Sequence, residues 1–165
     1  MSSMSTPGPE DPIAELSHDH SHLGVLVQAV RETFVRVERG ELAYADALHE
    51  LEDGAEALRE GLLVHFGREE EALFPFVEAH LPELRPRVAA LLADHDAVLA
   101  RADELCRASI ATRDPAVVDL PKAAWARFEE VYAGHAQAEH TLFREVGPAL
   151  DAAARAELQA LLEAV

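Results

Sequence analysis

The feature that most constrains this chain is a set of long apolar stripes at helical spacing. Four segments repeat apolar residues at alternating intervals of three and four positions, the pattern of an α-helix with one buried face. Glycine is sparse within them, and no alternation of apolar and polar residues lasts long enough to predict a strand. The segments run over about residues 12–39, 44–79, 86–108 and from Pro121 to about Glu145. They predict an all-α fold, an antiparallel up-down-up-down four-helix bundle with a short C-terminal fifth helix.

Capping residues, glycine and proline set the expected helix ends. Asp11-Pro12 offers an N-cap and a first-turn proline, so the first helix is expected to begin there and to end near Gly40. Pro75 is expected to bend the second helix or to break its last stretch. The stretch from Ser109 to Pro121 is expected to be a loop or a short irregular piece.

The expected organisation is one domain with short additions at both ends. Residues 1–11 are polar and contain prolines and a glycine, so we expect a disordered N-terminal tail. The four-helix bundle is expected over residues 12–147, because Gly147-Pro148 ends the last stripe. Asp151 can cap a final helix, so residues 148–165 are expected to pack on the bundle.

Composition argues against several classes of partner. Lys and Arg total 14 and Asp and Glu total 31, which gives a formal net charge of −17 at pH 7. A field of that sign repels nucleic acid and anionic membrane faces, so neither is expected as a partner. No apolar run approaches the roughly 18 residues of a membrane span, and no secretory signal is recognisable. With a single cysteine, Cys106, no internal disulfide can form, and a cytoplasmic protein is expected.

Six ionisable residues stand on the apolar stripes. They are His20, His65, Glu69, His95, His135 and Glu139. At the helical rise of 1.5 Å per residue, His20 lies roughly 27 Å before the end of the first helix, and His65 lies roughly 32 Å after the start of the second. The two histidines are therefore expected at similar height in the bundle. The others are expected within about two turns of that level. The six form two matching halves, because Asp19-His20 and Asp94-His95 are each followed about 40 to 45 residues later by His-x-x-x-Glu.

This set of residues suits a pair of metal ions. Histidine and glutamate at i and i+4 share one helix face, so both can reach one ion or two adjacent ions. An unpaired carboxylate in an apolar core is costly or is forced to protonate, whereas two cations bridged by the glutamates satisfy all six groups. Mixed nitrogen and oxygen ligation fits iron best, with manganese or zinc possible, and leaves positions open for oxo, peroxide or small gases. A hydrogen-bonded core histidine explains one such residue but not six in two matching halves.

The combined pattern His…His-x-x-x-Glu…His…His-x-x-x-Glu resembles the hemerythrin-like, HHE cation-binding proteins over about residues 12–147. The stretch from His65 to Pro75 resembles the second-helix signature of that family. The resemblance implies a non-haem centre of two oxo- or hydroxo-bridged iron ions in a four-helix bundle. The ligands that it implies are His20, His65, Glu69, His95, His135 and Glu139.

Two positions depart from the oxygen-carrying members of this family. Leu91 stands where those proteins have an additional histidine, and His140 stands where they have the last carboxylate, with Glu139 one residue earlier. Both departures disfavour reversible oxygen carriage. The set is more similar to the di-iron repair proteins of the iron–sulfur system and to bacterial peroxide- or nitric-oxide-responsive members. The cysteine-bearing N-terminal domain of the repair proteins has no counterpart in this sequence.

Three further residues are candidates for contact with the ligands. Tyr132 lies one turn before His135, although a core aromatic residue has the same spacing. Glu70 could orient a ligand histidine or belong to a solvated face, and His140 is adjacent to Glu139 or on the surface.

His18 and His22 lie on the far side of the helix from His20. We expect them to be solvated, although such an i, i+4 pair can bind a surface metal.

The leading hypothesis is a cytoplasmic di-iron protein that binds or reacts with O₂, H₂O₂ or NO, in sensing or detoxification. The sequence does not decide whether it is an enzyme. Alternatives are iron storage or delivery to a protein acceptor or redox partner, and a repair-type di-iron protein. A two-metal hydrolase and a metal-free interaction module are weaker hypotheses. The interaction module would leave the buried histidines and glutamates without partners.

Overall fold

All regular structure in the described part of the chain is helical. The computed structural model describes residues 11–111 and 119–165, and within these ranges no strand occurs, so the all-α prediction is confirmed. The elements are α1 (Pro12–Glu38), α2 (Tyr44–Arg68), a π-helical turn η1 (Glu69–Leu73), α3 (Phe74–His80), a 3-10 turn η2 (Pro82–Leu84), α4 (Arg85–Ala111), α5 (Asp119–Ala149) and α6 (Ala152–Glu163). Apart from Asp11, the expected disordered tail lies outside the described residues. No helix in these ranges is both long and apolar enough to cross a membrane.

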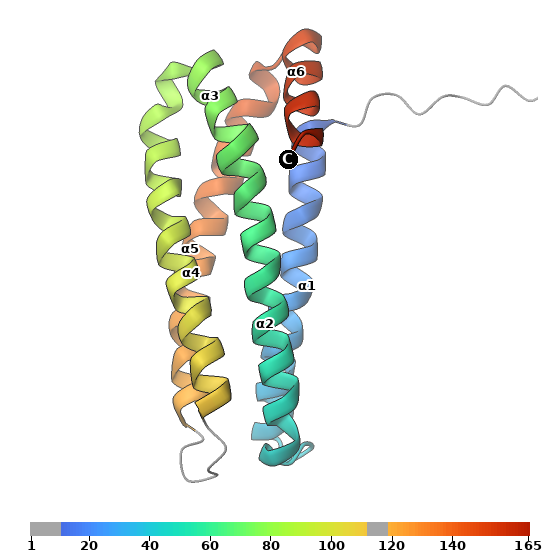
Figure 1. Ribbon diagram of the computed structural model, residues 1–165, viewed down its shortest axis with the longest axis vertical. Coiled ribbons are helices and arrows are strands. Elements are labelled where there is room, and N and C mark those ends of the chain that lie inside the picture. Colours follow the sequence, from blue (N-terminus) through green and yellow to red (C-terminus); the bar gives the residue numbers. More distant parts are fainter. Residues whose placement is uncertain (1–10, 112–118) are drawn as a thin grey trace, which may run out of the picture.

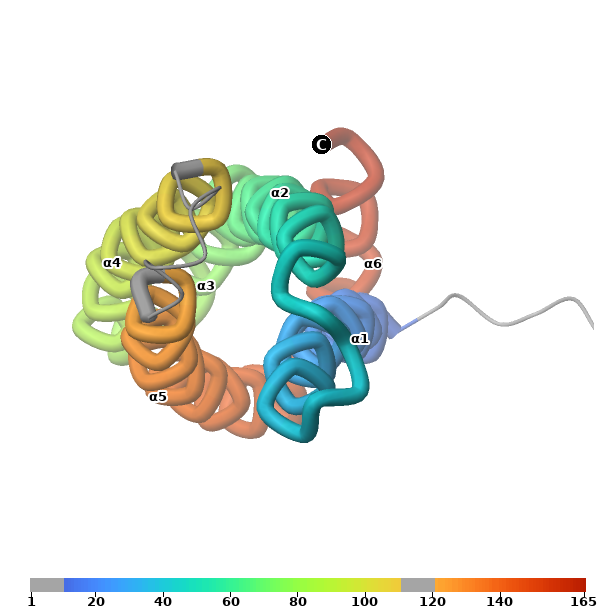
Figure 2. The backbone as a smooth tube through the Cα atoms, turned by 90° about the horizontal axis from the view of Figure 1, so that it is seen from below, coloured from blue at the N-terminus to red at the C-terminus, as the bar shows by residue number. Residues whose placement is uncertain are grey.

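The helices α1, α2, α4 and α5 lie side by side around a common interior, as the view along their axes shows (Figure 2). Helix α1 contacts α2, α2 contacts α4, and α4 contacts α5 along their lengths. The short helix α6 lies beside one end of α1 and contacts η1 (Figure 1). The inner faces of the long helices therefore point at one another.

Helices α1 and α2 approach closely because α2 carries glycines at the contact. A Cβ atom added at Gly54 would lie 3.0 Å from Cγ2 of Val30. One added at Gly61 would lie 3.1 Å from methyl groups of both Leu23 and Leu26. Larger residues would push against the α1 side chains, so the glycines set the narrow spacing of this pair.

The predicted helix starts are confirmed where capping residues define them. The carboxylate of Asp11 accepts a hydrogen bond from the backbone N–H of Ile13, and Pro12 occupies the first turn of α1. Asp151 accepts a hydrogen bond from the N–H of Ala154 at 2.8 Å, which starts α6. At the other end of α1, Gly40 takes a positive φ of 70°, a conformation that favours glycine.

The second predicted helix is interrupted before its expected end. The helix does not continue unbroken to Ala79, because the π-helical turn η1 separates α2 from α3. The expectation of a broken last stretch at Pro75 is confirmed, because that stretch is the separate helix α3, and Pro75 lies in its first turn, where a missing N–H is tolerated.

The fourth predicted helix is longer at both ends than expected. Helix α5 continues through Gly147-Pro148 to Ala149. The loop expected over residues 109–121 is shorter, since α4 reaches Ala111 and α5 begins at Asp119. Pro121 lies in the first turn of α5, where proline is favoured. Residues 112–118 are outside the described part.

The buried apolar residues form two clusters. One contains Leu16, Leu91 and Leu142 together with α3, and the other contains Leu23, Val98 and most of the buried residues of α2. Their order along each helix leaves one layer between them. The six ionisable stripe residues occupy this layer.

Candidate metal centre

The structure brings together the six ionisable residues that stand on the apolar stripes. They are His20 of α1, His65 of α2, Glu69 at the start of η1, His95 of α4, and His135 and Glu139 of α5. Five of the six are buried, with at most 3% of each residue exposed. The side chain of His20 is the exception, with 22% exposed.

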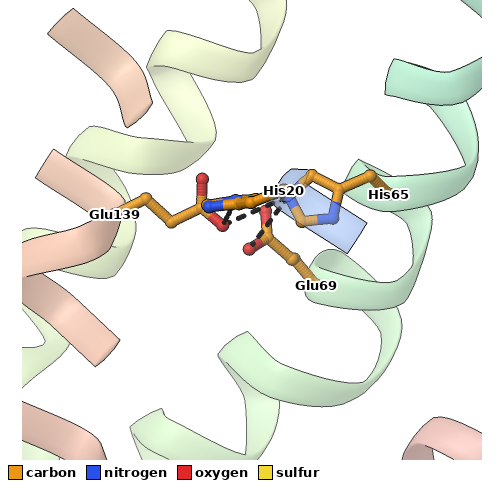
Figure 3. A group of neighbouring side chains, drawn as sticks. All are labelled: His20, His65, Glu69 and Glu139. Carbon is orange, nitrogen blue, oxygen red and sulfur yellow. Dashed lines mark hydrogen bonds and ion pairs between the residues drawn. The ribbon is translucent and has the colours of Figure 1, made fainter. Parts of the chain in front are cut away.

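The first group of atoms comes from the α1–α2 side of the interior. The Nε2 atoms of His20 and His65 are 2.9 Å apart. Oε1 of Glu139 lies 2.5 Å from the first and 3.2 Å from the second of these nitrogens (Figure 3). Oε1 of Glu69 lies 3.6 Å from Nε2 of His65. Two imidazole nitrogens and one oxygen from each glutamate thus surround one point.

The second group comes from the α4–α5 side and uses the remaining oxygens of the same glutamates. Oε2 of Glu69 lies 3.2 Å from Nε2 of His95. Oε2 of Glu139 lies 3.1 Å from Nε2 of His135. Each carboxylate therefore spans both histidine pairs, which is the arrangement of a bridging ligand between two ions.

The spacing and the unpaired state of these atoms fit cations. A metal ion that holds two ligand atoms at about 2.1 Å and at right angles keeps those atoms about 3.0 Å apart, close to the spacings seen here. Within the described residues, both oxygens of Glu69 and Oε2 of Glu139 are buried without a hydrogen-bond partner. The same holds for Nε2 of His95 and both ring nitrogens of His135. Buried polar atoms that converge without hydrogen bonds are costly, and a cation would supply their missing partner.

The pKa values of the two glutamates shift in opposite directions. Burial, reinforced by the Glu139 carboxylate, raises the pKa of Glu69 well above its usual range. Burial alone would raise the pKa of Glu139 too, but the neighbouring carboxyl group of Glu69 and the surrounding histidines hold it well below its usual range. Like charges packed this closely favour one shared proton. A bound cation would allow both carboxylates to ionise.

Glu70 is adjacent to the centre and contacts one of the candidate ligands. Its Oε1 lies 2.6 Å from Nδ1 of His95, the ring nitrogen that faces away from the carboxylate of Glu69. Such a contact fixes the ring orientation of a metal ligand. The structure thus places Glu70 where it can orient a histidine, one of the two roles considered for it.

The other two candidate contact residues are placed differently. The ring of Tyr132 is half-buried and stacks on Phe128 at 5.5 Å, as a core aromatic residue does. Burial and the charge of Glu139 raise the pKa of Tyr132 to about 12, which keeps its phenol neutral. His140 is exposed on α5, which agrees with the surface alternative.

The sequence reasoning missed an ion-pair cluster beside the centre. Arg68 donates hydrogen bonds to the carboxylates of Glu15 and Asp19. Oδ2 of Asp19 in turn lies 4.0 Å from Nδ1 of His65. The i, i+4 spacing of Glu15 and Asp19 could have indicated that the two carboxylates share a partner. It could not indicate which one, because Arg68 is 53 residues from Glu15 along the chain.

Aromatic rings close the α4–α5 side of the centre. The ring of Phe66 stacks on that of His95 with centroids 3.7 Å apart, and Phe74 stacks on it at 5.4 Å. On the α1 side, Phe143 stacks on His20 at 5.4 Å. These contacts exclude water more completely from His95 than from His20, whose ring remains partly exposed.

Comparison with known proteins agrees with the residue pattern. The model of the hemerythrin HHE cation-binding domain matches residues 11–146, which contain all six clustered residues. The resemblance noted from the sequence is thereby confirmed. No curated protein and no solved structure matches the chain significantly.

Proposed function

Since the chain belongs to the hemerythrin HHE cation-binding family, we propose that it is a non-haem di-iron protein that binds or reacts with O₂, H₂O₂ or NO. Sensing and detoxification are the roles that such chemistry serves. The antiparallel up-down-up-down four-helix bundle expected from the stripes would act as the scaffold, with one histidine from each long helix in a single layer.

One observation supports this proposal above the others. Glu69 and Glu139 each direct one oxygen to the His20–His65 pair and the other to the His95–His135 pair. Two bridging carboxylates and four imidazoles form a mixed oxygen and nitrogen ligand set, which suits iron and also accommodates manganese or zinc. When bound, iron would supply a change of valence and open positions for a small oxidant or gas.

The protein's own residues would hold, orient and shield the ions. Glu70 orients the imidazole of His95, and Phe66 and Phe74 keep water from that side. The partly exposed His20 leaves the other side more accessible, so a small ligand would approach there. Because the surroundings of the cluster are largely apolar, the proposal favours small molecules over polar organic substrates.

The first test is the metal content and visible spectrum of untagged protein purified aerobically. Two tightly held iron ions per chain with near-ultraviolet oxo-to-iron absorption would support the proposal. Rapid mixing with H₂O₂, O₂ and NO would then identify the reactant. Zinc or manganese in place of iron would favour the two-metal hydrolase. A folded protein that takes up no ferrous iron would overturn the proposal and favour the interaction module.

Iron storage or delivery is the second candidate, and the exposure of His20 is the observation that favours it. An ion held partly by an accessible ligand can leave more easily than one that is fully enclosed. Iron that passes to a chelator under reducing conditions would support delivery to a protein acceptor. Iron that stays bound through repeated redox cycles would support the gas or peroxide role, including that of a repair-type protein.

A further inference from the structure

A cavity of about 470 Å³ lies between α1 and α2, and its lining reaches the candidate metal centre. His18 and His22 of α1 and Glu60 and His65 of α2 all contribute to it. His65 is 3% exposed, and its Nδ1 has no hydrogen-bond partner among the described residues. The cavity therefore extends from the surface to the ring of a buried candidate ligand.

The outer part of this cavity carries a metal-binding pattern. His18 and His22 are one helical turn apart, both are exposed, and both line the same cavity. Imidazoles at i and i+4 on one helix can bind one ion together, as in the zinc-binding His-Glu-x-x-His motif. The exposed Glu60 of the facing helix offers a carboxylate to the same space. The histidine pair suits a divalent transition-metal ion such as Fe²⁺, Co²⁺ or Zn²⁺.

The charges around the cavity favour a cation. Its one arginine, Arg68, donates hydrogen bonds to both Glu15 and Asp19, which together more than offset its charge. Glu60 adds a further negative charge at the cavity wall. The whole chain carries a net charge of −17, so long-range attraction also concentrates cations at its surface.

The matching half of the molecule lacks this feature. Aligning His20 with His95 puts Ala93 and Ala97 at the positions of His18 and His22. The cavity between α4 and α5 measures about 230 Å³, and its lining contains Asp94 and Ala138 but no histidine among the described residues. The histidine pair therefore occurs in one half only. The other half shows which residues stand at these positions when the pair is absent.

We propose that the exposed pair His18 and His22 forms an outer site for a divalent transition-metal ion, which then reaches the buried cluster through the cavity beside His65. The outer site stands on its own residues, whereas the passage inward rests on the proposed function of the cluster. The ion would bind first at the exposed pair, and its raised local concentration would speed the filling of the buried positions.

The test uses the metal-free full chain and Co²⁺ as the probe. Calorimetric titration should show an additional weak site in the unmodified protein that disappears in the double variant His18→Ala, His22→Ala. Stopped-flow absorption at low Co²⁺ should show the buried cluster filling about tenfold more slowly in that variant, with the same final tightly bound amount. Both histidines are exposed, so the helical circular dichroism should not change.

Two controls separate the possible outcomes. Adding Ala93→His and Ala97→His to the double variant rebuilds a histidine pair on α4, away from the cavity. It should restore weak binding but not the fast filling. The exposed His49, changed to alanine, should alter neither quantity.

The proposal is overturned if the double variant His18→Ala, His22→Ala keeps the weak site or the fast filling. It is also overturned if the histidine pair added on α4 fully restores the filling rate. If the unmodified protein binds only the weak ion, the di-iron function fails and the outer site stands. If it binds only the tight ions, the outer site fails and the di-iron function stands.

Discussion

The two halves of the molecule contribute matching candidate ligands but enclose them differently. His20 and His65 come from α1 and α2, and His95 and His135 come from α4 and α5. The His20 side chain is 22% exposed, whereas those of His95 and His135 are 1% exposed. The repeat thus keeps the chemistry of the inner face while the residues behind it diverge. The difference keeps the candidate ligands His95 and His135 away from water and leaves His20 within reach of solutes.

The helix that carries each glutamate also differs between the halves. Helix α5 passes through Glu139 without interruption, whereas the helix that carries Glu69 changes to the π-helical turn η1 at that residue. A π-helical turn narrows the angle between consecutive side chains below the roughly 100° of an α-helix. In this turn Glu69 reaches the two histidine pairs while its neighbour Glu70 reaches His95. The irregular turn thus provides a candidate bridging residue and a candidate orienting residue from adjacent positions.

The largest effect is expected from removing a residue that serves both halves. Glu69→Ala deletes one oxygen from each group of ligand atoms, so the protein should lose both tightly held ions. Metal analysis after gel filtration measures this. Glu71→Ala, an exposed neighbour in the same turn, is the control and should keep its metal. A Glu69→Ala protein with full iron content would contradict the assignment of Glu69 as a bridging ligand.

The next largest effect is a difference in metal affinity between variants that each lose a histidine from one half. In His20→Ala, water can reach the vacated position and take the place of the imidazole, because that side chain is partly exposed. In His95→Ala, the rings of Phe66 and Phe74 exclude that water. We expect the metal affinity to fall at least about tenfold further in His95→Ala than in His20→Ala, equivalent to about 1.4 kcal/mol. Competition titration with a chelator measures the two affinities, and equal losses would show that the halves are energetically equivalent.

The sequence predicted the meeting of the six residues because the pattern is local and regular. Each histidine continues a stripe of period three to four, so its helix face follows from the neighbours on either side, as with His95 between Leu91 and Val98. The all-helical fold follows from the same stripes. The buried layer then needs only that the helices run alongside one another.

Other features depend on contacts or geometry that no local pattern encodes. The turn η1 keeps the apolar spacing of an ordinary helix, so the sequence predicted an interruption near Pro75 but not the π-helical geometry of the turn before it. Arg68 meets Glu15 and Asp19 across the contact of α1 with α2, and the partners are about 50 residues apart in the sequence. Loop length over residues 109–121 was overestimated because proline is compatible with a helix start as well as with a turn.

A smaller effect is expected at the orienting residue of the enclosed half. Glu70→Ala removes the acceptor for Nδ1 of His95 but leaves every candidate ligand in place. The loss of a partner of this kind weakens metal affinity by about 10- to 100-fold. The rate of metal release to a chelator should rise accordingly, and Glu70→Gln should recover part of the loss because its amide oxygen can still accept. An unchanged release rate in Glu70→Ala would show that the contact with His95 has no orienting role.

The smallest effect is expected at the ion-pair cluster of Arg68, which the half formed by α4 and α5 lacks because Ala138 stands at the matching position. Arg68→Ala places in the first half the alanine that Ala138 provides in the second, and it leaves Glu15 and Asp19 without their shared partner. Because these side chains are partly exposed, the free energy of unfolding at pH 7 should fall by about 1 kcal/mol or less. Although burial opposes it, hydrogen bonding to Gln159 and Arg68 lowers the pKa of Glu15, so its contribution to stability is present above its unfolded-state pKa and is lost as the pH falls. Urea unfolding of metal-free protein should therefore show a deficit in Arg68→Ala that shrinks below about pH 4. A deficit that stays constant to low pH would mean that Arg68 stabilises the fold through its apolar stem rather than through its charge.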